Sequence, residues 1–264
     1  NGGWWTTGEM LIAYLNFWPC EDDIRQGGVT KYITSVDGLT WSELKPLVDS
    51  AGQPVAGVFE QDPHTLPDGR IISAFHEQPG LRVSPYYTDD PTGLSGWTKG
   101  RMQNLPHPGP ESREMEPSWF YRADGAVVMV FRDQAESFHK LASISTDRGE
   151  TWSTPVLTNM PDSRSKQSAG NLPDGTAFQV SNPSNSRTRI PLAITLSQDG
   201  KLFDRAYLLR SGTDLQPLRY PGQYKGQGFS YPKSVIWNDF LYAAYAANKE
   251  DAEITRVPLS SLTL

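Results

Sequence analysis

Glu116 and Arg132 are the two residues whose types and spacing point most directly to chemistry. They stand eight residues before and eight residues after Asp124 in the segment EPSWFYRADGAVVMVFR, residues 116–132. In an antiparallel hairpin, residues equidistant from the turn face each other, so this carboxylate and this guanidinium meet at the open end of one hairpin. A plain cross-strand ion pair at the end of a sheet is the structural alternative.

The same eight-residue interval places other polar side chains at open hairpin ends. They are Tyr231 before Asp239, Glu60 and His76 around Asp68, and Lys166 and Asn182 around Asp174. Arg189 stands at the start of the strand IPLAITLS, and the loop 16–28 adds Glu21, Asp22 and Asp23. We therefore expect titratable groups from distant parts of the sequence to converge on one face.

Several of these residues have a structural alternative. Tyr231 is equally explained as an aromatic that packs between sheets, and Asp22 and Asp23 as solvated loop acids. His64 lies four residues before Asp68 and faces the same way as Glu60 by strand alternation. It either lines the same space or satisfies a backbone group.

The elements that must position these residues repeat along the chain. Asp turns, which are polar turns closed by an aromatic residue, occur as SVDGLTW (35–41), YTDDPTGLSGW (87–97), STDRGETW (145–152) and SQDGKLF (197–203). A second set of turns, the inner turns, alternates with them: TTGE (6–9), LPDG (66–69), RADG (122–125), LPDG (172–175) and WNDF (237–240). Four antiparallel strands in each unit of about fifty residues are typical of a β-propeller blade.

The composition limits the classes of partner. The chain has 264 residues, a net charge of −6 and one cysteine, Cys20, which cannot form an internal disulfide. An acidic chain argues against nucleic acid, and no apolar run approaches the roughly 18 residues of a membrane span. A pocket that concentrates arginines is still compatible with an anionic small substrate.

The Asp turns resemble the Asp boxes of the sialidase (neuraminidase) superfamily, whose fold is a six-bladed β-propeller. The resemblance implies an all-β chain with one propeller domain over residues 1–264. Its first blade is expected to be incomplete at the N-terminus, because the family's first arginine would fall just before Asn1.

The resemblance also implies roles for residues. Tyr231 would be the nucleophile, with Pro232 where serine is usual, Glu116 its base, and Asp23, preferred over Asp22, the acid. Arg132 and Arg189 would bind the substrate, with Arg187 a close competitor for Arg189, and Glu60 and His76 complete the predicted substrate-binding set. The family uses no cofactor or metal, and the analogy suggests a secreted or periplasmic protein.

This set of residue types suits an acidic sugar. Planar guanidinium groups bind a carboxylate bidentately, and a tyrosine nucleophile avoids the repulsion that a carboxylate nucleophile would meet. The sequence thus predicts a retaining exo-glycoside hydrolase that releases a terminal sialic acid or a related acidic sugar. Two alternatives stay open: a polysaccharide lyase that uses His64, His76 or Tyr231, and a carbohydrate-binding propeller without catalysis.

Overall fold

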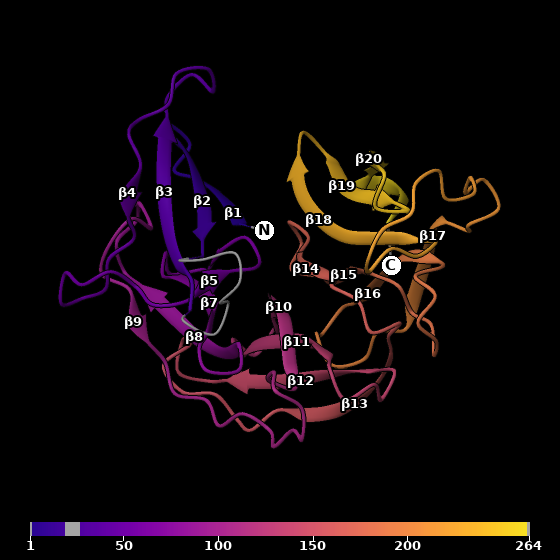
Figure 1. Ribbon diagram of the computed structural model, residues 1–264, viewed down its shortest axis with the longest axis horizontal. Coiled ribbons are helices and arrows are strands. Elements are labelled where there is room, and N and C mark those ends of the chain that lie inside the picture. The colour runs from indigo at the N-terminus through magenta and orange to yellow at the C-terminus, as the bar shows by residue number, and fades with distance from the viewer. Residues whose placement is uncertain (1, 19–26, 263–264) are drawn as a thin grey trace. The chain divides into compact units, whose positions relative to one another are not determined.

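The computed structural model describes residues 2–18 and 27–262, and the described part of the chain is built from β-strands (Figure 1). The strands form five antiparallel sheets in which neighbours follow the order of the chain, except that two short strands of one sheet both pair with the strand that follows them. The single 3-10 helix given for these residues is Leu259–Ser261. No helix in the described ranges is long and apolar enough to cross a membrane. The described chain separates into two compact units.

Unit 1 comprises Asn1–Glu114 and Ile144–Pro155. Its first sheet contains β1 (Gly2–Thr6), β2 (Leu11–Phe17), β3 (Val29–Ser35) and β4 (Lys45–Pro46). Its second sheet contains β5 (Val58–Phe59), β6 (His64–Thr65), β7 (Ile71–Glu77), β8 (Arg82–Thr88) and β9 (Thr98–Lys99). The core is aromatic: Phe59 stacks on Tyr14 and meets Phe75 and Trp97 edge to face.

Unit 2 comprises Met115–Ser143 and Val156–Leu264 and carries three sheets. They are β10 (Glu114–Tyr121), β11 (Val127–Asp133), β12 (His139–Ser145) and β13 (Val156–Pro161); β14 (Ser168–Asn171), β15 (Ala177–Ser181), β16 (Leu192–Ser197) and β17 (Arg205–Arg210); and β18 (Phe229–Trp237), β19 (Phe240–Ala247) and β20 (Asp251–Pro258). Strand β19 shows why these segments form strands. Its alternate residues Leu241, Ala243, Tyr245 and Ala247 are buried, and this period of two is typical of a strand with one buried face.

The five sheets are the blades of an all-β propeller fold, and they correct two expectations. Six blades were expected, but each blade needs its own inner hairpin, and the sequence holds only five such turns. The first blade was expected to lack its innermost strand. Instead β1 pairs with β2 along its whole length, from Gly2 opposite Leu15 to Thr6 opposite Leu11. The sheet with three strands is the last one, β18-β19-β20.

The Asp turns form as local hydrogen-bonded units. The Asp147 carboxylate accepts from the backbone N–H of Thr151 at 2.8 Å, and the Trp152 indole donates to the Gly149 carbonyl at 3.0 Å. Gly149 has φ +87°, a backbone conformation that favours glycine. Asp37 accepts from the N–H groups of Leu39 and Thr40 in the same way. These turns close hairpins, as their sequences predict.

Candidate active site

The strongest candidate site is a cavity of about 400 Å3 in unit 2, and its lining is cationic. The described lining residues include six cations and no acid: Arg132, Arg164, Arg187, Arg189, Lys225 and Lys249. Tyr224, Tyr231, Ser163, Ser230, Gly226 and Gln227 complete the lining. Arg132 and Arg189 therefore line one cavity, as expected, and a shared anion position for their two guanidiniums stays a prediction. A chain of net charge −6 has concentrated positive charge here, which suits an anionic ligand.

Glu116 and Arg132 form the predicted pair at the open end of the β10–β11 hairpin. The Arg132 Nη1 atom donates to Glu116 Oε2 at 3.0 Å, and its Nη2 atom donates to Gln134. Glu116 is buried, and burial alone raises the pKa of its carboxyl. The nearby charges of Arg132, Lys166 and Arg189 outweigh burial and hold the pKa of Glu116 below its ordinary value. Glu116 is thus an ionised acceptor at neutral pH.

Arg189 is positioned by backbone contacts and has no carboxylate partner within salt-bridge distance among the described residues. Its carbonyl accepts from the Phe229 N–H at 2.9 Å and from Asn182 Nδ2 at 3.1 Å. A Cβ on Gly228 would lie 2.8 Å from the Arg189 carbonyl oxygen, so only glycine permits this approach. Arg187, the competitor for the same role, is 68% exposed and forms an ion pair with Glu136. The geometry favours Arg189 for a ligand inside the cavity.

Tyr231 sits in a β-bulge that breaks the β18–β19 ladder. Ser230 pairs with Ala246 and Lys233 with Ala244, so Tyr231 and Pro232 together oppose one residue. Pro232 has no N–H to donate to the ladder, and Tyr231 has φ +57°. Glu116 has the same combination, φ +52° followed by Pro117. Such conformations cost about 1–3 kcal/mol each and cluster at functional sites. Tyr231 and Glu116 thus share a rare backbone conformation, a positive φ before proline.

The ring of Tyr231 lies beside two cations. Arg189 Cζ is 5.1 Å and Lys249 Nζ is 5.2 Å from the ring centroid, both within the range of a cation–π contact. The sequence also predicts a hydrogen bond between the Tyr231 hydroxyl and Glu116. Among the described residues Tyr231 forms no such hydrogen bond, and Glu116 Oε2 accepts from Arg132. The assigned roles of Tyr231 and Glu116 stay predictions.

A buried polar network supports the backbone beneath this cavity. Lys140 Nζ forms an ion pair with Asp162 at 2.8 Å, with both side chains at most 2% exposed. Lys140 also donates to Gln167 Oε1 at 3.3 Å, and Gln167 Nε2 donates to the Glu116 carbonyl at 2.8 Å.

A second branch of the network reaches Arg189. Asp162 accepts from the Ser165 N–H at 3.1 Å, and Ser165 Oγ donates to Asn182 Oδ1 at 2.9 Å. Asn182 then holds the Arg189 carbonyl. One buried ion pair therefore connects to the backbones of both Glu116 and Arg189.

The remaining predicted residues are placed less favourably. Asp23 and Asp22 lie outside the described residues. Glu60 and His76 belong to unit 1, and their predicted opposition is wrong. Val58 opposes His76, because the segment between β5 and β6 shifts the register by two residues. His76 is buried and its Nδ1 lies 3.1 Å from the Leu81 carbonyl oxygen. Their part in substrate binding stays a prediction.

Four cationic or aromatic lining residues were not selected from the sequence: Arg164, Tyr224, Lys225 and Lys249. Lys249 follows β19 at the end opposite the WNDF turn, but the eight-residue interval counted forward from Asp239 reaches the buried Ala247, two residues short of it. Tyr224 and Lys225 lie in the long connection between β17 and β18, where no periodic signal marks them. Arg164 lies in the connection between β13 and β14, which the strand periodicity does not cover.

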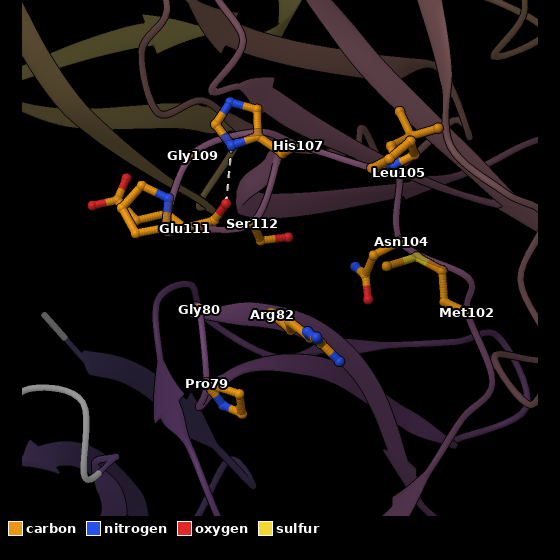
Figure 2. A pocket seen from close by; sticks show the side chains of 12 residues that line it. Pro79, Gly80, Arg82, Met102, Asn104, Leu105, His107, Gly109, Glu111 and Ser112 are labelled. Atoms are coloured by element: carbon orange, nitrogen blue, oxygen red, sulfur yellow. Dashed lines mark hydrogen bonds between the residues drawn. The ribbon is translucent and has the colours of Figure 1, made fainter.

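Unit 1 holds a larger cavity, of about 660 Å3, with a different lining (Figure 2). Arg82 contributes the one arginine among its described lining residues, and Glu111 and His107 stand across from it. The His107 ring nitrogen Nδ1 lies 3.0 Å from the Glu111 carbonyl oxygen. Asn104 and Ser112 both donate to the buried Glu114 carboxylate, so these polar groups hold the loop in place.

Comparison with solved structures identifies the same fold in sialidases. The Hadza microbial sialidase superposes with a TM-score of 0.70 at 13% identity, covering 98% of this chain and 52% of that one. The intramolecular trans-sialidase from Ruminococcus gnavus, solved with oseltamivir carboxylate, gives 0.66 at 18%, covering 90% and 52%. The Trypanosoma rangeli sialidase, solved with sialic acid, gives 0.60 at 15%, covering 98% and 44%.

These likenesses show the fold, and the chain spans about half the length or less of these three structures. A comparison with curated protein sequences gives no match. The family model of the BNR repeat-like domain matches residues 3–243. Because this match covers most of the sequence, the chain belongs to the BNR repeat-like domain family, within the sialidase-like propellers.

Proposed function

We propose that the protein is a retaining exo-glycoside hydrolase that releases a terminal sialic acid or a related acidic sugar. The observation that carries the proposal is the unit 2 cavity, where Arg132 and Arg189 line one space with Tyr231. A carboxylate on the anomeric carbon of the sugar would be bound there by the two guanidiniums.

The chemistry assigns one task to each group. The Tyr231 hydroxyl oxygen attacks the anomeric carbon and gives its proton to Glu116, which is ionised because nearby cations lower its pKa. The bond to the leaving oxygen breaks as an acid, assigned to Asp23, protonates it. The same residue then takes a proton from the water that attacks the anomeric carbon, while the tyrosine oxygen leaves and regains its proton from Glu116. Two substitutions at one carbon retain its configuration.

Support for this proposal comes from shared backbone geometry as well as from charge. Glu116 and Tyr231 both have positive φ, both precede proline, and both lie at the open end of their hairpins. A tyrosine that only filled the core would not need a bulge that leaves it half-exposed in a cationic cavity. The proton transfer requires Glu116 to turn toward the tyrosine when substrate occupies the cavity.

Analysis of the product by proton NMR tests the proposal. The protein is incubated with an α-linked sialoside of a neutral sugar, and the α-anomer of the free acid is expected first. An unsaturated sugar that absorbs in the near ultraviolet identifies a lyase instead. Ligand binding without any product identifies a carbohydrate-binding protein, and either result contradicts the hydrolase.

A further inference from the structure

The unit 2 cavity holds more positive charge than one sugar carboxylate requires. Six cations line it, and Arg132 and Arg189 suffice for a single carboxylate. The other four have different local partners. Glu136 forms ion pairs with both Arg164 and Arg187, and Glu250 forms one with Lys225.

Lys249 differs from the other three, since it has no carboxylate partner within salt-bridge distance in the described part of the chain. Its Nζ atom donates to the Tyr224 carbonyl and lies over the Tyr231 ring. Glu250, its neighbour in sequence, is engaged by Lys225 and by Arg219. A half-buried cation without a carboxylate partner is available to an anion from outside.

The position of Lys249 is built into the fold. The preceding residue, Asn248, is buried and its side chain donates to the Gln216 carbonyl at 2.7 Å. Asn248 Oδ1 accepts from the Gly228 N–H at 3.1 Å, and its own N–H donates to the Gly228 carbonyl at 2.8 Å. Gly228 is also bridged to Arg189. The segment around Gly228 thus fixes the backbone at Arg189 and next to Lys249, the two residues whose cations lie over the Tyr231 ring.

We infer that the cavity takes a glycan with two anionic groups, of which Lys249 binds the second. Arg132 and Arg189 hold the carboxylate of the terminal sugar, and Lys249 holds a carboxylate or sulfate on the adjoining residue. This inference rests on the proposed function, because it assumes that the terminal group is an acidic sugar.

Titration calorimetry with three disaccharides tests the inference, in the Tyr231→Phe protein so that no ligand is consumed. A sialic acid is linked to a neutral hexose, to a second sialic acid, or to a 6-sulfated hexose. We expect at least one dianionic ligand to bind roughly tenfold more tightly than the neutral-hexose ligand, as a charge-assisted hydrogen bond at a half-buried site implies. The two dianionic ligands distinguish a carboxylate from a sulfate.

Substitution of Lys249 assigns that difference to one side chain. In Lys249→Met the affinity ratio between dianionic and monoanionic ligands should fall to about one, and Lys249→Arg should restore it. Lys201→Met is the matched control, because Lys201 is an exposed lysine in an Asp turn outside the cavity, and it should leave the ratio unchanged.

The outcomes separate this inference from the proposed function. Equal affinity for all three ligands overturns the inference, as does a ratio of dianionic to monoanionic affinity that is unchanged in Lys249→Met. The hydrolase proposal survives both results, because it requires only that the sialoside of the neutral hexose binds. Failure of all three ligands to bind overturns both.

Discussion

Two cavities lined by described residues, one in each unit, differ in a way that volume does not predict. The unit 1 cavity is the larger, about 660 Å3 against about 400 Å3, yet two of its polar groups, Asn104 and Ser112, donate to the buried Glu114 carboxylate. In the unit 2 cavity, Arg189 is held by its backbone and Lys249 by its neighbour Asn248, while the two side chains have no carboxylate partner among the described residues. Polar groups whose carboxylate is already paired within the protein shape a loop, whereas cations in excess of the nearby carboxylates can recognise an anionic ligand.

Replacing Tyr231, in the unit 2 cavity, is expected to have the largest effect on turnover. Tyr231→Phe removes only the oxygen that is proposed to attack the sugar, so turnover should fall by about 10³-fold or more with KM little changed. Initial rates on an aryl sialoside measure this. Tyr242→Phe, in the same sheet and outside the cavity lining, is the control and should keep full activity. An active Tyr231→Phe protein would make Tyr231 a packing residue.

The buried Lys140–Asp162 network connects to the backbone of the site residues, so we expect that breaking it destabilises the folded protein. Lys140→Met leaves the buried Asp162 carboxylate without its cation, and breaking such a pair costs about 3 kcal/mol. Urea unfolding measures the change in the free energy of unfolding. Arg205→Met removes an exposed ion pair with Asp204 and should change it by no more than about 1 kcal/mol. Equal losses in the two variants would contradict a supporting role for the buried pair.

Arginine substitutions compare the two cavities directly. Arg132→Met should lower kcat/KM by roughly 10- to 100-fold, the value of a charge-assisted hydrogen bond to a carboxylate. Arg82→Met, in the unit 1 cavity, should change it by less than twofold. The result that reverses the comparison is a larger loss for Arg82→Met than for Arg132→Met.

The pH dependence of stability should show the ionised state of Glu116. Its pKa in the folded protein lies below the ordinary value of 4.5, so the folded state binds fewer protons than the unfolded state near that pH. The stabilisation by ionised Glu116 is then complete above about pH 5 and is lost as the pH falls through the lowered pKa.

Urea unfolding of wild type and Glu116→Gln from pH 7 to pH 3 measures this contribution. The difference in unfolding free energy should stay constant to about pH 5 and shrink below it. A difference that grows as the pH falls would show that the pKa of Glu116 is raised rather than lowered.

Much of the fold could be predicted because its determinants are local. The Asp147 turn carries its own hydrogen-bond acceptor, glycine and tryptophan, and LPDG and RADG fix the inner hairpins. The Glu116–Arg132 pair followed from counting outward from Asp124. The number of blades came from the family resemblance alone and was wrong, while the five turn units in the sequence matched the five sheets.

The features that could not be predicted depend on irregular backbone. The register shift before β6 moved Glu60 away from His76, and nothing in the sequence between them announces two extra residues. Lys225 reaches the cavity from a connection without periodicity. Lys140 and Asp162 lie at the open end of the same β12–β13 hairpin, but a register shift between His139 and Leu141 offsets its two strands, so equal counting outward from the Asp147 turn does not pair them.

The most direct test of the central claim is whether the unit 2 cavity recognises a sugar carboxylate. Calorimetry compares binding of N-acetylneuraminic acid with that of its methyl ester, which keeps the shape of the sugar and loses the charge. We predict that wild type binds the free acid about 10- to 100-fold more tightly than the ester, and that Arg132→Met and not Arg82→Met removes this preference. Equal binding of acid and ester by the wild-type protein would contradict the account.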